Sequence, residues 1–389
     1  MHCHDTDFEA GKVIAALKKK FVCYGSAYSY ADPIWDGIDF EKIETLFYPK
    51  QTKNEQGIEE VVLFHLKSKD KSAVFYAMER LSGNPDVVFA EPDYLYDLHI
   101  LPNDPLYKFL WGMENIRAPL AWNYTTGSPD VVVGVLDSGV DSTHPDLSAN
   151  LLFPGGRFMD SRDETGHGTH VAGTVGAVGN NLTGVTGVCW NVGLINLKIG
   201  NVFIDLAAAI EAIHYATLHT IPILNNSWGG RRNSAALRLA IEQYDGLFIA
   251  SAGNNGTNND LLPMFPASYN LDNIISVAAL SPDNTLAPFS NFGIRSVHIA
   301  APGTRVLSTD LYGEYSYMNG TSMAAPHVAG AAALLKSYRT GLTALDMKYI
   351  ILSSAERLPD LSDKVATGGI LNANAMFQTA DRLGERALS

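Results

Sequence analysis

The chain has 389 residues, of which 46% are apolar and 18% charged, a composition typical of a globular protein with a large buried core. Its formal net charge of −13 argues against nucleic acid as a partner, because a polyanion would be repelled. No apolar run approaches the roughly 20 residues of a membrane-spanning helix, so a membrane is not an expected partner either. The three cysteines make no disulfide framework, and we expect free thiols at Cys3, Cys23 and Cys189.

Residues 1–99 predict a small domain of their own. Apolar patterning indicates strands at 11–17, 58–66 and 87–89 and amphipathic helices at 39–48 and 71–82. The order strand, helix, strand, helix, strand is typical of a small α+β sheet with helices on one face. Residues 95–105 carry two prolines and no strong pattern, so we place the domain boundary there.

From about residue 106 the pattern changes to alternating strands and helices. Uninterrupted apolar runs suit parallel strands that are covered on both faces, and they occur at 131–136, 192–199, 221–224, 247–250, 274–280 and 297–301. Helices are expected at 205–219, 233–244 and 343–353. The sequence therefore predicts an α/β fold with a mostly parallel sheet between two layers of helices, and functional residues at the carboxyl ends of its strands.

One segment predicts a reactive serine. Residues 320–330 read Gly-Thr-Ser-Met-Ala-Ala-Pro-His-Val-Ala-Gly and begin an apolar, buried helix. Pro326 is tolerated in the first turn because its missing N–H would have no helical partner. Ser322 thus lies where free N–H groups and the helix dipole favour developing negative charge. Gly-Thr-Ser before a helix is also ordinary capping chemistry, so this segment alone decides nothing.

Two further residues could activate such a serine. Asp137 ends the apolar run 131–136, and a carboxylate at a buried strand end costs free energy unless it is paired. His167 lies at a glycine-flanked helix start, where a lone histidine is more often a core residue. Together the three groups can form a triad, in which Asp137 fixes the tautomer of His167 and His167 accepts the proton of Ser322.

The segments around these residues resemble the signatures of the subtilisin-like serine proteases, the subtilases. The matching segments are 135–140 (Val-Leu-Asp-Ser-Gly-Val), 167–173 (His-Gly-Thr-His-Val-Ala-Gly) and 320–327 (Gly-Thr-Ser-Met-Ala-Ala-Pro-His). They follow the family's own chain order, Asp, His, Ser. The resemblance covers residues 100 to about 375 and implies that 100–389 is a catalytic domain of a serine endopeptidase. It assigns the base to His167 and makes His170 a structural neighbour.

The resemblance also implies an oxyanion donor and a substrate pocket. Residues 251–256, Ser-Ala-Gly-Asn-Asn-Gly, resemble the family's oxyanion segment with Asn254 as side-chain donor, whereas the plain alternative is a surface Asn-Gly turn. The two pocket walls would be Ser227, Trp228 and Gly229, and Ser251, Ala252 and Gly253. Small residues there would leave backbone free to pair with an extended peptide, and Trp228 either lines a subsite or belongs to the core. Neither wall carries an acid, so we hypothesise a broad or large apolar P1 preference.

A loop at 178–185, Val-Gly-Asn-Asn-Leu-Thr-Gly-Val, resembles a calcium loop of some family members. The resemblance implies a structural Ca²⁺ held by Asp104, Asp146 and Asn181 and by the carbonyls of Val178, Thr183 and Val185. Hard cations prefer such oxygen ligands. The alternative is an Asx-rich loop without an ion.

Residues 1–99 resemble the family's long inhibitory propeptide, a ferredoxin-like α+β domain, most closely at 90–94 (Ala-Glu-Pro-Asp-Tyr). The resemblance implies a monomeric zymogen that is its own inhibitor, with polypeptides as substrates and self-cleavage between Tyr94 and Asn103. No continuous apolar region follows Lys20, so no signal peptide is recognisable. Because long propeptides accompany export in the family, we expect a secreted protein whose signal peptide is not part of this sequence, with the cytoplasm as the alternative.

Two other functions are alternatives to an endopeptidase. A catalytically silent relative would keep the fold as a binding or scaffold protein, but the triad and Asn254 are all present here. An unrelated α/β hydrolase needs Gly-x-Ser-x-Gly and the order Ser, acid, His, whereas here the serine comes last in Gly-Thr-Ser-Met-Ala.

Overall fold

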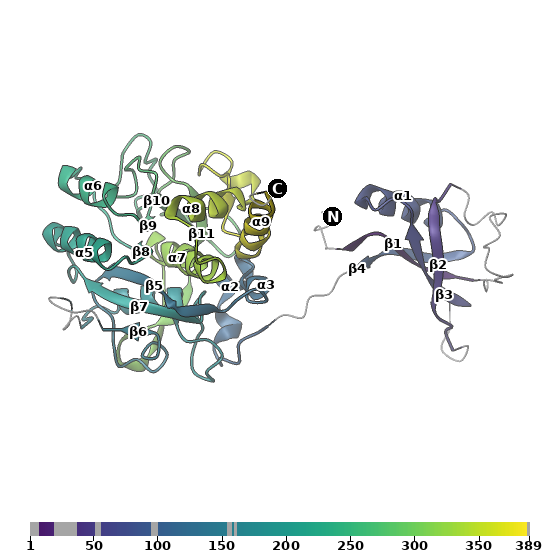
Figure 1. The fold of residues 1–389 in the computed structure, drawn as a ribbon, viewed down its shortest axis with the longest axis horizontal. Helices are drawn as coiled ribbons and strands as arrows, with labels where there is room; N and C mark the ends of the chain where they lie inside the picture. The colour runs from purple at the N-terminus through teal and green to yellow at the C-terminus, as the bar shows by residue number, and fades with distance from the viewer. Residues whose placement is uncertain are drawn as a thin grey trace. The chain divides into compact units, whose positions relative to one another are not determined.

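The computed structural model describes residues 8–18, 37–50, 56–94, 100–153, 158 and 162–386. The chain divides into two compact units, Met1–Leu98 and His99–Ser389 (Figure 1). Cys3, Cys23 and the stretch 24–36 lie outside the described residues, whereas Cys189 is a buried free thiol.

The N-terminal unit is a four-stranded antiparallel sheet of order β2-β3-β1-β4 with one described helix. Its elements are β1 (Phe8–Leu17), β2 (Phe40–Phe47), β3 (Glu60–Leu66), α1 (Lys71–Ser82) and β4 (Val87–Tyr94). The helix buries Val74, Ala77 and Leu81. This strand order is that of a ferredoxin-like sheet, as the resemblance implied.

The predicted helix at 39–48 is wrong, because the segment is strand β2. Phe40 and Ile43, three residues apart, are both buried, and that spacing is the one a helix would show. A register shift between Phe40 and Lys42 changes which face the following residues point to. An irregularity of this kind inserts an extra residue, so two side chains at odd spacing reach the same face.

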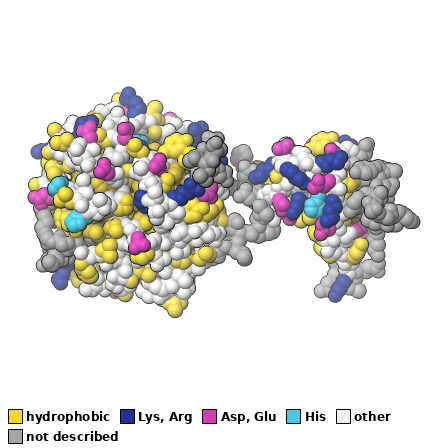
Figure 2. All heavy atoms as spheres, in the orientation of Figure 1, with side chains coloured by type: hydrophobic (Ala, Val, Ile, Leu, Met, Phe, Trp, Pro, Cys, Tyr) yellow, Lys and Arg dark blue, Asp and Glu magenta, His cyan; other side chains and the backbone are white. Residues whose placement is uncertain are grey.

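The surface of the N-terminal unit carries mixed charges. Figure 2 shows Lys and Arg close to Asp and Glu there, and Lys42 and Lys69 pair with Glu44 and Glu41 at 2.7 and 2.9 Å. Exposed pairs of this kind contribute little to stability. The stability of the unit therefore depends on its own apolar core, in which Phe40 and Phe64 meet edge to face.

The C-terminal unit is built on a sheet of nine described strands in the order β14-β15-β11-β10-β9-β8-β5-β7-β6. The strands are β5 (Gly127–Asp137), β6 (Leu151–Leu152), β7 (Asn191–Lys198), β8 (Ile223–Asn226), β9 (Leu247–Ser251), β10 (Ile274–Leu280), β11 (Ile299–Pro302), β14 (Glu356–Arg357) and β15 (Gly369–Ile370). Neighbouring strands are parallel except β14 and β15. The predicted mostly parallel sheet is confirmed, because each expected apolar run contributes a strand.

Helices cover both faces of this sheet. They are α2 (Trp111–Asn115), α3 (Ala118–Ala121), α4 (His167–Gly176), α5 (Leu206–Leu218), α6 (Ala235–Glu242), α7 (Thr321–Tyr338), α8 (Ala344–Ser353) and α9 (Ala373–Arg386), and a hairpin of β12 (Val306–Thr309) and β13 (Tyr315–Met318) lies beside them. One apolar core holds α4, α7, α8 and α9, and a second holds α5 and α6. The three helices expected at 205–219, 233–244 and 343–353 are confirmed as α5, α6 and α8. In the described part of the chain, no helix is both long and apolar enough to cross a membrane.

The sheet and α7 together define where a site can form. Strand β5 ends at Asp137, β8 ends just before Ser227, and β9 ends at Ser251. Helix α7 is buried from Thr321 to Leu335 and packs against these strands. Ser322, its second residue, therefore lies beside the carboxyl ends of the central strands.

Candidate active site

Asp137 and His167 form a short hydrogen-bonded pair. The Nδ1–H of His167 donates to Asp137 Oδ1 at 2.6 Å, and the backbone N–H of Ser138 donates to the same oxygen at 2.7 Å. The Asp137 side chain is only 4% exposed, whereas that of His167 is 36% exposed. Asp137 Oδ2 is buried and has no hydrogen-bond partner among the described residues. A buried carboxylate with one oxygen that accepts no hydrogen bond strongly attracts the imidazole beside it.

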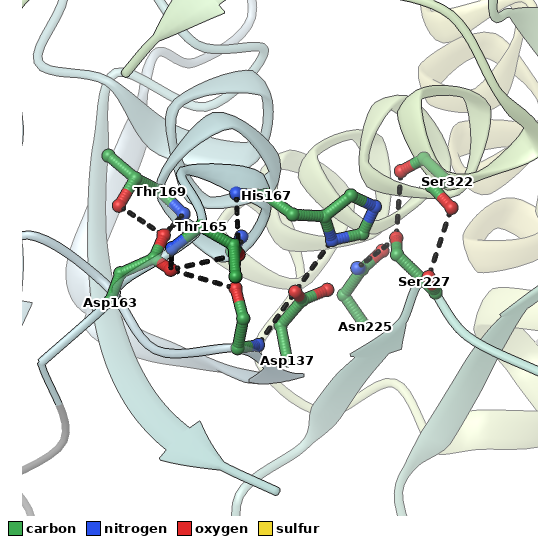
Figure 3. A network of polar contacts seen from close by, with 10 residues as sticks. Asp137, Asp163, Thr165, His167, Thr169, Asn225, Ser227 and Ser322 are labelled. Carbon is green, nitrogen blue, oxygen red and sulfur yellow. Dashed lines mark hydrogen bonds and ion pairs between the residues drawn. The ribbon is translucent and has the colours of Figure 1, made fainter. Parts of the chain in front are cut away.

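The charges around His167 favour its protonated form. Burial acts to lower the pKa of His167, but the charge and hydrogen bond of Asp137 and the charge of Asp163 together raise it above its ordinary value. Asp137 also fixes the proton on Nδ1, so Nε2 of a neutral ring is the nitrogen free to accept a proton. Figure 3 shows the imidazole between Asp137 and Ser322.

Ser322 is hydrogen-bonded to Ser227, the residue that follows β8. Its Oγ donates to the carbonyl of Ser227 at 3.0 Å, and Ser227 Oγ donates to the carbonyl of Ser322 at 2.7 Å (Figure 3). Asn225 Nδ2 donates in turn to Ser227 Oγ at 2.9 Å. Among the described residues, no hydrogen bond joins Ser322 Oγ to the His167 ring. In enzymes without substrate, catalytic hydrogen bonds are often long or poorly aligned and tighten only when substrate binds.

Asn254 faces the start of α7. Its Oδ1 accepts from the N–H and the hydroxyl of Thr321, both at 2.9 Å, so the opposite amide nitrogen, Nδ2, is the one left to donate. A Cβ built on Gly320 would lie 3.5 Å from Asn254 Nδ2 and 3.5 Å from the backbone N of Ser322. Two N–H donors thus surround one small space that Gly320, lacking a side chain, leaves open. An oxyanion next to Ser322 needs such a pair of donors.

Asn291 holds the loop that carries Asn254, a role that the sequence did not reveal. Its side chain is fully buried. Its Oδ1 accepts from the backbone N–H groups of Asn255 and Thr257 at 2.9 and 3.1 Å, and its Nδ2 donates to the carbonyl of Ala252 at 3.1 Å. Asn291 is separated from Asn254 by a whole strand, and a buried asparagine far along the chain gives no local signal.

The two expected pocket walls, residues 227–229 and 251–253, differ in burial and in hydrogen bonding. Ser227 is buried and hydrogen-bonded to Ser322, whereas Gly229 is exposed, although a Cβ there would lie 3.0 Å from the Phe265 carbonyl. Trp228 is partly buried and packs on the core beside α5 and α6, which supports its core interpretation.

In the second wall, the expectation of free backbone fails at Ala252. Its N–H donates to Val277, and its carbonyl accepts from Asn259 and Asn291. Ser251 pairs with Val277 within the sheet, and the N–H of Gly253 donates to Thr321 Oγ1 at 3.0 Å. Backbone groups that the fold already uses cannot also pair with a peptide.

His170, the second histidine of the middle motif, is fully buried inside α4. Its Nε2 contacts the carbonyl of Val306 at 3.0 Å, and burial lowers its pKa to about 4. A ring that is enclosed in this way supports the hairpin β12–β13 and cannot reach a substrate.

The residues of the expected calcium site lie together in one loop cluster. Asp146 Oδ1 accepts from Asn181 Nδ2, and its Oδ2 accepts from the N–H of Val185, both at 2.8 Å. Asp104 accepts from the N–H groups of Asn180 and Asn181 at 2.7 and 3.3 Å. The N–H of Val178 donates to the carbonyl of Asp146, and that of Thr183 donates to Asn181 Oδ1.

The charges of this cluster fit a hard cation. Asp104 and Asp146 are 4% and 0% exposed, and in the described part of the chain neither pairs with a Lys or Arg. Burial, with a smaller contribution from the charge of Asp104, raises the pKa of Asp146 to about 6. A cation would offset these two buried charges, and the donors are all oxygens. The amide of Asn181 would have to turn, because its nitrogen faces Asp146.

The comparisons place the chain among known proteins. The family model described as the subtilase family matches residues 128–376. The thermophilic serine proteinase of Bacillus sp. strain AK1 is 36% identical over 309 residues, which cover 77% of this chain and 75% of that protein. An intracellular serine protease of Paenibacillus polymyxa is 40% identical, with 58% of this chain and 72% of that protein covered. A solved structure of a protease from Pseudoalteromonas arctica matches with a TM-score of 0.63 at 31% identity, covering 72% of this chain and 99% of that one.

The chain therefore belongs to the subtilase family. It is a subtilisin-like serine endopeptidase, with the fold of that class and polypeptides as its substrates.

Proposed function

We propose that the enzyme cleaves peptide bonds through the triad Asp137, His167 and Ser322 and a covalent acyl-enzyme. The observation that carries the proposal is the 2.6 Å contact between His167 Nδ1 and Asp137 Oδ1 at the start of α4, with Ser322 on the other side of the ring (Figure 3). His167 Nε2 takes the proton of Ser322 as its Oγ attacks the carbonyl carbon, and then gives that proton to the leaving amine. Water repeats the sequence to release the acyl group.

The oxyanion of each tetrahedral intermediate would be bound by Asn254 Nδ2 and the backbone N–H of Ser322. Their common distance from the Cβ position of Gly320 supports this assignment. The helix dipole of α7 adds to the stabilisation, because Ser322 lies in its first turn.

The test of the triad uses the full chain and a fluorogenic peptide. Ser322→Ala and His167→Ala should each abolish hydrolysis. Ser353→Ala, on α8, should leave it unchanged, because among the described residues its hydroxyl donates to the Ile350 carbonyl alone. Retained activity in Ser322→Ala would reject the proposal. Melting temperatures of all three variants show whether a loss of activity reflects unfolding.

We further propose that residues 1–99 inhibit the catalytic unit until the chain cuts itself between Tyr94 and Asn103. The separate compact unit and its ferredoxin-like sheet support this role. At the C-terminal end of this segment, Asn103 Oδ1 accepts from the N–H of Leu182 at 2.9 Å. A cut before this residue would leave that hydrogen bond intact.

The cluster of Asp104, Asp146 and Asn181 is proposed to hold a structural Ca²⁺ with the carbonyls of Val178, Thr183 and Val185. When bound, the ion would supply positive charge to two buried carboxylates and join the segment at Asp104 to the loop 178–185. It would have no part in bond cleavage.

Substrate choice, oligomeric state and location are also proposals. The absence of an acid in the two wall segments supports a broad or large apolar P1 preference, and a faster turnover of Arg than of Phe or Leu peptides would reject it. Relatives named as extracellular and as intracellular both occur, and the long N-terminal unit favours secretion. The enzyme is further proposed to act as a monomer. Immunoblots of culture medium against cell lysate decide the location, and light scattering decides the mass.

A further inference from the structure

A second buried carboxylate lies behind the triad. Asp163, in the loop before α4, is 3% exposed and makes no ion pair in the described part of the chain. Its Oδ1 accepts from the hydroxyl of Ser138 at 2.9 Å and from the N–H and hydroxyl of Thr165 at 3.0 and 3.2 Å. Its Oδ2 accepts from the N–H and hydroxyl of Thr169 at 3.0 and 2.7 Å. Five donors therefore converge on one carboxylate (Figure 3).

These donors belong to the two elements that carry the triad's acid and base. Thr169 is the third residue of α4, and its N–H is one of those that no helix carbonyl can accept. The N–H of Gly168 donates to Ser138 Oγ at 2.9 Å, and the N–H of His167 donates to Thr165 Oγ1 at 3.3 Å. Asp163 thus accepts, directly or through one hydroxyl, from the whole first turn of α4.

On the strand side, the link runs through Ser138. This residue follows Asp137 directly, and its own N–H donates to Asp137 Oδ1. The two elements are in very close contact: a Cβ on Gly168 would lie 2.0 Å from the Gly139 carbonyl and 3.1 Å from Asp137 Cβ. At such close contact, the hydrogen bonds to Asp163 fix the separation between the end of β5 and the start of α4.

We propose that Asp163 is a positioning residue of the catalytic site: it ties the first turn of α4 to the end of β5 and so holds the imidazole of His167 in register with Asp137. The inference rests on the proposed triad. A residue that fixes the relative position of acid and base affects turnover, because small displacements of catalytic groups are costly in rate.

A carboxylate is needed at this position because every partner is a donor. In Asp163→Asn, the new NH₂ must face either the backbone N–H of Thr165 or that of Thr169, depending on the amide orientation. The hydroxyls can rotate to accept, but neither backbone N–H can. One buried donor is therefore left facing another, and the first turn of α4 must move away from β5.

The charge of Asp163 gives a second readout. The titratable groups around His167 are Asp137 at the end of β5, Asp163, His170 on α4 itself, and Asp310 after β12, which lies against Gly166. Asp163 adds to the rise in the pKa of His167. Removing its charge should therefore move the acid limb of the activity profile to lower pH, which loss of packing alone would not do.

The experiment compares Asp163→Asn with wild type, both expressed as the full chain, on a fluorogenic peptide. We expect kcat to fall between about 10-fold and about 100-fold with KM little changed. The acid limb of kcat/KM should move to lower pH. Self-cleavage needs the same site as peptide hydrolysis. A folded variant that stays full length on a gel therefore also shows the expected loss of activity. A folded variant with wild-type kcat and pH profile overturns the proposal.

Two further variants keep the result decisive. Asp205→Asn is the matched control, because Asp205 caps α5 by accepting from the N–H groups of Ala207 and Ala208, and it should change stability without changing kcat or the pH profile. Ser138→Ala removes the bridge but keeps the charge, so kcat should fall with the acid limb unmoved. If Asp163→Asn does not fold, wild-type kcat in Ser138→Ala overturns the proposal. Undiminished hydrolysis by Ser322→Ala would instead reject the triad itself.

Discussion

The side-chain oxygen of Asn254 accepts two hydrogen bonds from Thr321, the residue directly before Ser322, each 2.9 Å long. The amide orientation is thereby fixed by the same helix turn that carries the serine. The oxygen is occupied, so the NH₂ group is the one that can meet a developing negative charge. Asn254, the proposed oxyanion donor, is therefore linked to the nucleophile Ser322 by two hydrogen bonds to Thr321, its covalent neighbour.

Replacing Asn254 by Ala should lower kcat by ~10²–10³-fold with little change in KM, because the donor acts on charge that develops only in the transition state. That range was itself measured for such a donor in a subtilisin. Asn255→Ala is the control, because the side chain of Asn255 is exposed and its backbone N–H, which the substitution keeps, donates to Asn291 Oδ1. Steady-state kinetics on one peptide decide the matter, and equal losses in both variants would count against the assignment.

The triad motifs could be predicted from sequence because each combines a reactive residue with an element boundary. Asp137 follows an apolar run, and Ser322 precedes one, so the fold class already places both at the same edge of the sheet. The positions of Asn291 and Asp163 could not be found in this way. Their roles depend on contacts such as that between Asp163 and Ser138, 25 positions apart, which only the folded chain creates.

The error at 39–48 has a related cause. Hydrophobic spacing reports the period of side chains along a regular element, and β2 is not regular. A register shift places Phe40 and Ile43 on one face, and nothing in the local sequence distinguishes that from a helical turn. The strands of the α/β unit are easier to predict from sequence, because strands such as β10 are buried on both faces and form continuous apolar runs.

The pH dependence follows from the environment of His167. Burial acts to lower its pKa, but Asp137 and Asp163 raise it above the ordinary value of 6.5. Only the neutral ring accepts the serine proton, so kcat/KM should rise with pH through a midpoint above that value. Asp137→Asn removes the main raising charge, so the midpoint should shift to lower pH while kcat falls ~10⁴-fold, the scale known for serine proteases. A flat wild-type profile between about pH 6 and pH 8 would contradict the assigned base.

Removal of calcium should destabilise the catalytic unit. A ligand at 100 times its Kd stabilises a fold by about 2.7 kcal/mol, which corresponds to a fall of about 5–10 °C in Tm when EDTA removes it. Asp146→Asn should shrink this EDTA effect, because it removes one of the two buried carboxylates. Asp283→Asn should retain the full effect, because Asp283 is exposed and its Oδ1 accepts from the N–H and hydroxyl of Thr285, far along the chain from this loop. An unchanged Tm in EDTA for the wild type would reject the calcium site.

Processing of the chain tests the proposed inhibitory role of residues 1–99. Ser322→Ala should remain full length on a gel, because self-cleavage needs the same nucleophile as substrate cleavage. A trace of mature wild-type enzyme, added to this variant, should cut it between Tyr94 and Asn103, and the hydrogen bond from the N–H of Leu182 to Asn103 Oδ1 should survive that cut. N-terminal sequencing of the product locates the bond. Activity towards a peptide should appear in the wild type only as the full-length band disappears. Full peptidase activity in an uncut wild-type chain would show that residues 1–99 do not silence the site.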